Sequence, residues 1–167
     1  MATKSYKLLI VESPSKAKTI GKYLGDDYVV RASVGHVRDL PKSNKAAIDI
    51  PAGFVPHYEI SKGKAEVVHE LDTLAKKASE VLLATDPDRE GEAIAWHIKE
   101  ACGLKKPKRI VFHEITKNAI EEALKHPRTI DENLRVAQEA VTFQLQGLSE
   151  LRAFGFAEHG CRPRGLS

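Results

Sequence analysis

The sequence is poor in cysteine, and the cysteines it has are scattered. Its 167 residues include two cysteines, Cys102 and Cys161, which lie far apart and belong to no Cys-x-x-Cys pair. This spacing argues against a zinc-binding cluster and against a disulfide framework. The helical apolar pattern around Cys102 indicates a position in the core.

Long apolar runs and nucleotide-binding loops are also missing. No apolar stretch approaches the roughly 18 residues that a membrane span needs, and residues 1–6 lead into a strand-like segment without signal-peptide organisation. We therefore expect a cytoplasmic protein with no membrane partner. Neither Gly-x-x-x-x-Gly-Lys-Ser/Thr nor Gly-x-Gly-x-x-Gly occurs, so no nucleotide cofactor is expected.

The composition itself is ordinary for a globular protein, with 42% hydrophobic and 29% charged residues. The length suits about one domain with a core of its own. A net charge of +3 and a pI near 8.8 are mildly basic. This balance is compatible with nucleic-acid binding but is far too weak to establish it.

Short apolar runs alternate with helical patterns along the chain. Strands are expected at 8–11, 28–34, 81–84 and 109–112, and the continuous apolar runs among them are typical of strands buried on both faces. Helices are expected at 14–24, 64–78, 90–102, 116–124 and from 131, while 35–58 is expected to be irregular. The alternation predicts an α/β fold in which a parallel sheet is flanked by helices.

Three acidic residues, Asp86, Asp88 and Glu90, lie at alternate positions where the strand at 81–84 gives way to a helix. Carboxylates this close repel one another, and a hard divalent cation such as Mg²⁺ relieves the repulsion. Ligands of open α/β sheets bind at the carboxyl ends of the strands. Glu12, which follows the first strand, reaches the same edge if the two strands are neighbours. These residues form a candidate Mg²⁺ site.

Two other interpretations fit parts of this acidic run. A calcium loop of the EF-hand type needs a glutamate at its twelfth position, which here is His97, and a helix before it instead of a strand. A solvated acidic helix start, favoured by the helix dipole, accounts equally well for Glu90 and Glu92 by themselves. It accounts poorly for three spaced acids at a strand end.

Basic side chains accompany the candidate site. Lys16 and Lys18 fall in the first turns of the opening helix, where a positive charge opposes the helix dipole by about 0.3–1 kcal/mol unless an anion binds there. Lys16, four residues after Glu12, is the stronger candidate for function, whereas a solvated surface position is favoured for Lys18. His36 and Arg38 stand in a glycine-containing loop and are able to contact phosphates, although spacing alone favours an ordinary turn.

Four motifs, in this order, resemble bacterial type IA DNA topoisomerase I: Val11-Glu12-Ser13-Pro14-Ser15-Lys16-Ala17-Lys18-Thr19-Ile20, residues 33–41, residues 86–96 and residues 114–120. The resemblance begins near residue 4 and ends near residue 140. It implies a Toprim domain, a Rossmann-like α/β fold, over residues 1–126, and the start of a following helical domain at 127–140. Other Toprim enzymes, such as primases, share only the isolated glutamate and the acidic triplet, so the remaining motifs point to the topoisomerase branch.

The resemblance implies an enzyme that relaxes negatively supercoiled DNA. Such an enzyme cuts one strand with a tyrosine, passes the other strand and reseals the break. Glu12 would be the acid/base at the 3′ oxygen, and Lys16 would stabilise charge on the scissile phosphate. Glu12, Asp86 and Asp88 would hold Mg²⁺, and Glu90 would support the site as a further catalytic residue.

Further contacts to DNA, whether single-stranded or negatively supercoiled, are implied by the same resemblance. Arg89 would belong to the catalytic group and would contact DNA together with His36. Arg38 and Lys18 would complete the DNA-binding set.

The sequence departs from the family in two respects. None of its tyrosines (Tyr6, Tyr23, Tyr28 and Tyr58) stands in the nucleophile motif, which belongs to a later domain of the family. After Ala140 the family's paired arginines are absent, and residues 141–167 form an irregular, divergent tail, for which a frameshift or an aberrant gene end is our hypothesis. We expect a chain that binds Mg²⁺ and, weakly, DNA, but that relaxes no DNA without the downstream topoisomerase domains. The alternatives are a free-standing Toprim nuclease or primase-like enzyme and a non-catalytic DNA-binding module.

Overall fold

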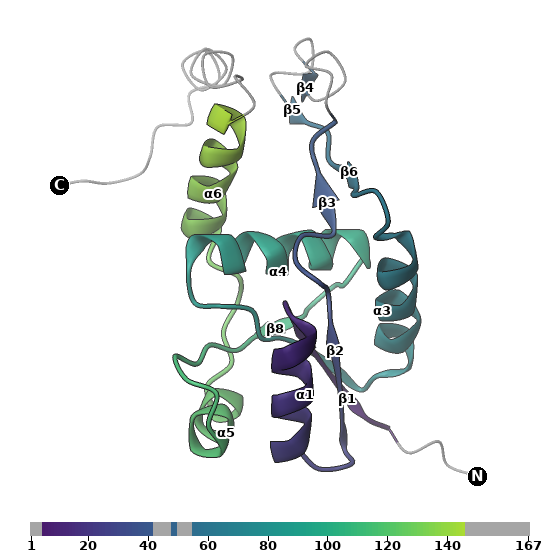
Figure 1. Ribbon diagram of the computed structural model, residues 1–167, viewed down its shortest axis with the longest axis vertical. Helices are drawn as coiled ribbons and strands as arrows, with labels where there is room; N and C mark the ends of the chain where they lie inside the picture. The colour runs from purple at the N-terminus through teal and green to yellow at the C-terminus, as the bar shows by residue number, and fades with distance from the viewer. Residues whose placement is uncertain (1–4, 42–47, 50–54, 146–167) are drawn as a thin grey trace, which may run out of the picture.

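The fold is built around one parallel sheet. The computed structural model describes residues 5–41, 48–49 and 55–145. Four strands lie in the order β2 (Tyr28–Ala32), β1 (Lys7–Val11), β7 (Glu80–Leu83) and β8 (Lys108–Arg109). Every pair of neighbours runs parallel, which confirms the predicted architecture (Figure 1).

Strand β1 is central because its side chains are apolar on both faces. Leu8, Leu9, Ile10 and Val11 are all fully buried. Leu8 and Ile10 belong to one core cluster, whereas Leu9 and Val11 belong to a second. Successive side chains of a strand point to opposite faces, so this continuous apolar run supplies both cores of a helix–sheet–helix sandwich.

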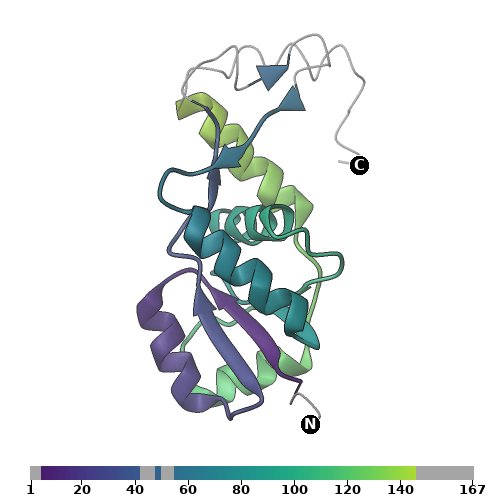
Figure 2. The same cartoon turned by 90° about the vertical axis from the view of Figure 1, so that its right-hand side faces the viewer.

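Helices cover both faces of the sheet. On one face α1 (Pro14–Tyr23) and α5 (Lys117–Lys125) contribute their buried residues to the cluster with Leu9. On the other face α3 (Ala65–Lys77) and α4 (Arg89–Ala101) contribute to the cluster with Leu8. Figure 2 shows α1 and α3 on opposite sides of the strands. Buried Cys102 packs in the cluster with Leu8, as the sequence predicted, whereas Cys161 lies outside the described residues.

Above α4 the chain forms a second, smaller region (Figure 1). Two short antiparallel pairs, β3 (Arg38–Asp39) with β6 (Glu59–Ile60) and β4 (Ile48–Asp49) with β5 (Val55–Pro56), lie within the stretch predicted to be irregular and just beyond it. The helix α6 (Glu132–Leu145) packs against α4. No helix in the described part of the chain is long and apolar enough to cross a membrane.

Three elements end two or more residues away from the predicted position, whereas the other predicted bounds agree to within one residue. Strand β2 stops at Ala32, two residues early, because Val34 has a φ of 57° and turns the chain out of the extended conformation. Strand β8 covers Lys108–Arg109 and does not continue to Phe112. Helix α6 continues to Leu145 beyond the predicted change at residue 141, and the rest of the divergent tail lies outside the described residues.

Candidate active site

The candidate site lies where β1 and β7 end side by side. The two strands are parallel neighbours, with Ile10 opposite Leu83. Glu12 therefore lies at the same edge of the sheet as the acids that follow β7, as expected if the two strands are neighbours. The chain leaves β1 toward β2 on one side and later returns to β7 on the other, which makes this edge the switch point of the sheet. Glu12, Asp86, Asp88 and Glu90 all line one pocket here, of about 380 Å³.

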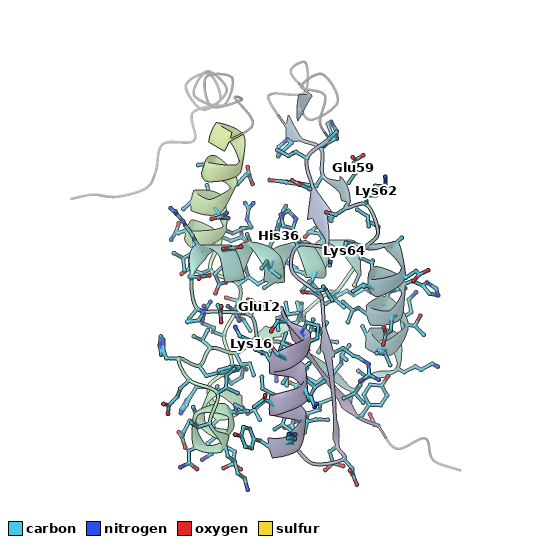
Figure 3. All side chains as sticks on the ribbon, in the orientation of Figure 1. Glu12, Lys16, His36, Glu59, Lys62 and Lys64 are labelled. Atoms are coloured by element: carbon cyan, nitrogen blue, oxygen red, sulfur yellow. The ribbon has the colours of Figure 1, made fainter. Side chains whose placement is uncertain are left out.

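Lys16 lies between the two carboxylates that end these strands. Its Nζ lies 2.6 Å from Asp86 Oδ1 and also forms an ion pair with Glu12 Oε1. The backbone N–H of Asp86 donates to Glu12 Oε2 at 3.2 Å, so the two strand ends are joined directly as well. Figure 3 shows Glu12 and Lys16 close together at the top of α1.

The start of α1 explains why Lys16 can reach both acids. Ser13 is the N-cap, and its Oγ accepts the backbone N–H of Lys16 at 3.4 Å, while Pro14 occupies the first turn. The helix therefore begins immediately after Glu12. One turn of helix separates Glu12 from Lys16, which places the two side chains on the same face.

This arrangement shifts the proton affinities of all three groups. Partial burial raises the pKa of Glu12 above its ordinary value, against the opposing effect of Lys16. For Asp86 burial acts in the same direction, but hydrogen bonds with Lys16 and Glu12, together with the charges of Lys16 and Arg109, hold its pKa below the ordinary value. Although burial by itself lowers the pKa of Lys16, the two carboxylates raise it overall. The site thus contains one carboxyl group that retains a proton more readily than the other.

The turn from β7 into α4 is fixed by its own hydrogen bonds. Asp88 caps α4, with its Oδ1 accepting the N–H of Gly91 at 2.7 Å. Thr85 Oγ1 donates to the carbonyl of Gly91 at 2.6 Å. A Cβ atom on Gly91 would lie 1.9 Å from the backbone oxygen of Asp86, so only glycine fits at this position. The backbone positions of both aspartates are therefore set by the fold.

A buried ion pair lies beneath this turn, and sequence reasoning missed it. Arg109 and Glu92 are both fully buried, with Arg109 Nε 3.1 Å from Glu92 Oε1. The Arg109 guanidinium also donates to the carbonyl oxygens of Leu83 (3.1 Å), Thr85 (2.7 Å) and Asp86 (2.6 Å). The arginine thereby holds the end of β7 and the backbone of a candidate ligand.

The exposure of two glutamates separates the interpretations that the sequence left open. The Glu90 side chain is 62% exposed, as a solvated helix start requires, whereas Glu92 is fully buried. The sequence held one signal for this difference. Arg109 begins an apolar run that was predicted to be a strand, and an arginine buried in a sheet needs a buried acid as its partner.

The remaining predicted residues fall into two groups. His36 lies beside the site, with its Nε2 3.5 Å from Glu90 Oε1. Arg38 is partly buried in β3, where its Nε lies 3.3 Å from His97 Nδ1. Lys18 and Arg89 are exposed and are not among the residues that line the pocket with Glu12.

The turn that carries His36 is tied to the end of β1. The N–H of Ser33 donates to Val11 O at 2.8 Å, and the N–H of Gly35 donates to Glu12 O at 2.9 Å. Val34 and Gly35 both have positive φ values and line the same pocket as Glu12. The glycine loop therefore forms one wall of the candidate site. From its spacing alone, an ordinary turn had been favoured over a functional site.

The donor set at this edge suits a hard divalent cation. Four carboxylates line the pocket, and one ammonium group, that of Lys16, neutralises part of their charge. Among the residues that the structure describes, no three His, Cys, Asp or Glu side chains are already arranged to hold a metal ion. None of the chain's four tyrosines (Tyr6, Tyr23, Tyr28 and Tyr58), all of them described, lines this pocket.

Comparison with known proteins agrees with this geometry. The model of the Toprim domain matches residues 7–115, and the chain belongs to that family. Among solved structures, full-length topoisomerase I from Thermotoga maritima is similar, with 51% sequence identity and a TM-score of 0.73 over 80% of this chain. The chain covers 23% of the length of that protein. The resemblance stated from the motifs is thus confirmed over the Toprim region.

Proposed function

We propose that this chain is the N-terminal catalytic part of a DNA topoisomerase I, and that it supplies the Mg²⁺-binding and acid–base half of a site that cuts and reseals one DNA strand. The convergence of Glu12, Lys16 and Asp86 at the ends of two neighbouring parallel strands carries this proposal. The similarity to the Thermotoga maritima enzyme supports the choice of DNA as substrate.

Each residue of the site has a chemical task in this proposal. Glu12, whose pKa is raised, exchanges a proton with the 3′ oxygen that leaves the phosphate on cleavage and returns on resealing. Lys16 stabilises the negative charge on the scissile phosphate. Asp86 and Asp88, with Glu12, would hold Mg²⁺, whose positive charge would offset that of the phosphate. Glu90 is a supporting acid at the rim of the pocket.

The attacking tyrosine comes from another part of the enzyme in this proposal, since no tyrosine of the chain lines the pocket. Contacts with the DNA backbone fall to His36, beside Glu90, and to the exposed side chains of Arg89 and Lys18. Arg38 contacts DNA from the neighbouring pocket, where it packs against aromatic rings.

Binding of Mg²⁺ to the full chain tests the metal site. We expect isothermal titration calorimetry to show Mg²⁺ binding, and we expect Asp86→Asn to abolish it because a neutral amide is a poor ligand for a hard cation. Asp26→Asn is the matched control, since Asp26 is an exposed residue between α1 and β2, remote from the pocket. Equal Mg²⁺ affinity of the wild-type chain and Asp86→Asn would contradict the proposal.

Incubation of the chain with supercoiled plasmid and Mg²⁺ tests the proposal that the chain carries the metal-binding and acid–base residues but not the nucleophile. We expect neither relaxation nor a covalent adduct. Relaxation with an adduct would show that the chain carries its own nucleophile. Mg²⁺-dependent nicking that Asp86→Ala abolishes would instead indicate a free-standing nuclease.

A further inference from the structure

A hollow with a cationic rim lies apart from the candidate active site, and we name it the basic hollow. It has a volume of about 600 Å³ and is lined by the last turn of α4, the segment between α4 and β8, and the segment between α5 and α6. None of its lining residues lines the pocket that contains Glu12. Helix α4 begins at the active site, and its 13 residues span roughly 20 Å. The basic hollow therefore lies at the far end of this helix from the carboxylates.

Backbone hydrogen bonds hold the two segments that form the walls of the basic hollow. The N–H of Arg109 donates to Arg128 O, and the N–H of Arg128 donates to Arg109 O, both at 2.7 Å. The turn that follows α4 is closed by the N–H of Leu104, which donates to Lys99 O at 2.9 Å. The walls of the hollow are therefore held by the fold itself.

The charge on this surface is strongly one-sided. Among the described residues that line the hollow, five are cations and one is an acid: Lys99, Lys105, Lys106, Lys108 and Arg128 against Glu132. Lys108 and Arg128 have acidic partners within the fold. The side chains of Lys99, Lys105 and Lys106 form no ion pair with any residue in the described part of the chain. The dipole of α4 favours a lysine in the last turn, which accounts for Lys99 but not for the two lysines beyond the helix. The excess of positive charge is suited to an anionic partner.

The space between the cations is apolar. Pro107, Pro127 and Ile130 line it, and Ile130 packs against the core cluster with Leu8. Contacts with a nucleic-acid backbone need cations and N–H donors but no apolar floor. Unpaired bases need aromatic rings or guanidinium planes on which to stack. None of the described residues that line the hollow is aromatic, and the Arg128 guanidinium is held by Glu92 and by the carbonyl of Thr129 at 2.8 Å. The lining therefore suits an apolar side chain between carboxylates better than it suits DNA.

We propose that the basic hollow binds an acidic segment of a partner protein, in which an apolar side chain stands between aspartates or glutamates. The apolar side chain occupies the floor at Pro107 and Ile130, and the flanking carboxylates pair with Lys105 and Lys106. This site goes beyond the proposed function, because it uses neither the carboxylates of the active site nor Mg²⁺, and a partner bound here leaves the active site open. Pairs between exposed charges are individually weak and are screened by salt, so binding weakens as the ionic strength rises.

Fluorescence anisotropy of a labelled peptide tests this proposal. The probe is fluorescein-labelled Asp-Asp-Leu-Phe-Asp-Asp, titrated with the full chain at low ionic strength in EDTA, so that no metal contributes. We expect saturable binding of the probe. Asp-Asp-Ser-Ser-Asp-Asp and Asn-Asn-Leu-Phe-Asn-Asn should each bind at least about fivefold more weakly, since the first lacks the apolar side chains and the second lacks the charges. No saturable binding of the probe, or equal binding of either control peptide, would overturn the proposal.

Substitutions locate the bound peptide. Lys105→Glu with Lys106→Glu reverses two exposed charges on the rim and should weaken binding of the probe at least about tenfold. Lys22→Glu with Lys62→Glu is the matched control, because it makes the same change of net charge at exposed lysines that do not line the hollow. Equal weakening by the two double variants would indicate only a general attraction of the basic chain for acidic peptides, and would sink the site. Thr129→Glu, which adds an acid at the same rim, should also weaken binding, and it decides if the first double variant proves unstable.

Competition separates a protein partner from a nucleic acid. A single-stranded DNA hexanucleotide has a charge similar to that of the peptide. We expect it to displace the labelled probe less effectively than an unlabelled copy of the peptide does, because it has no side chain for the apolar floor. Displacement by the hexanucleotide at equal or lower concentration would identify the hollow as a phosphate-binding surface and overturn the proposal.

Discussion

The buried pair of Arg109 and Glu92 gives the strongest prediction about stability. Arg109→Met keeps most of the buried volume but removes the fully buried cation of the pair with Glu92, whose Oε1 lies 3.1 Å from Arg109 Nε, and leaves Glu92 with the partly exposed Arg128. It also removes the guanidinium that donates hydrogen bonds to the carbonyl oxygens of Leu83, Thr85 and Asp86. Removing one partner of a buried ion pair typically costs about 3–5 kcal/mol, because the remaining charge stays buried with less compensation.

Urea unfolding followed by circular dichroism measures this loss. A domain of this size is stabilised by about 5–15 kcal/mol, and its dependence on urea is about 2 kcal/mol per molar. Division of the expected loss by this slope gives a fall in the unfolding midpoint of roughly 1.5–2.5 M for Arg109→Met.

Arg128→Met is the matched control, because Arg128 also pairs with Glu92 but is 38% exposed. We expect it to cost no more than about 1 kcal/mol, since solvent reaches the Arg128 guanidinium and screens its charge, and Arg109 still pairs with Glu92. The double variant Arg109→Met with Glu92→Leu removes both charges and should recover part of the loss. Arg109→Met within about 0.5 kcal/mol of the wild-type chain, or no more destabilised than Arg128→Met, would refute the argument.

Three further predictions concern other parts of the fold. Gly91→Ala should cost at least about 1–3 kcal/mol in urea unfolding, because its Cβ would meet the backbone oxygen of Asp86 at 1.9 Å; Gly21→Ala in α1, with open space around it, should be neutral or stabilising, and equal effects would contradict the clash. Burial lowers the pKa of His97 from 6.5 to about 3, so the unfolded chain takes up a proton at pH values where the folded chain does not. The free energy of unfolding is highest above pH 6.5 and falls as the pH drops toward 3, by about 1.4 kcal/mol at pH ~5.5, and His97→Gln should remove this part of the pH dependence. Tyr6→Phe should cost about 0.5–1.5 kcal/mol in thermal or urea unfolding, because the phenol donates to Leu74 O at 2.9 Å, and an unchanged midpoint would show that the bond contributes nothing.

The features that the sequence predicted are those with local signals. The run from Leu8 to Val11 is apolar at every position, which is typical of a strand buried on both faces. Parallel pairing of β1 with β7 then places the acids that follow the two strands at one edge of the sheet. Ser13 and Pro14 favour a helix start through their own side chains, and the structure has α1 begin there.

The features that the sequence did not predict depend on contacts between distant segments. Glu92 has the pattern of an exposed helix start, and its burial follows from Arg109, which arrives from another strand. His97 entered the sequence argument only as a failed calcium ligand, yet it packs with Tyr58, which comes from a stretch predicted to be irregular. Two-residue strands such as β3 and β6 leave no periodic pattern for a sequence to show.

Glu92 also connects the candidate active site to the start of α6. Its Oε2 accepts the backbone N–H of Asp131 at 2.9 Å, and its Oε1 binds Arg109, whose Nη2 donates to Asp86 O at 2.6 Å. A continuous series of short polar contacts thus runs from the segment that leaves the Toprim fold to the backbone of a proposed Mg²⁺ ligand. Any rotation of α6 away from α4 must either break this series inside the core or pull on the turn that carries Asp86. The junction with the following segment is therefore mechanically coupled to the turn that carries Asp86.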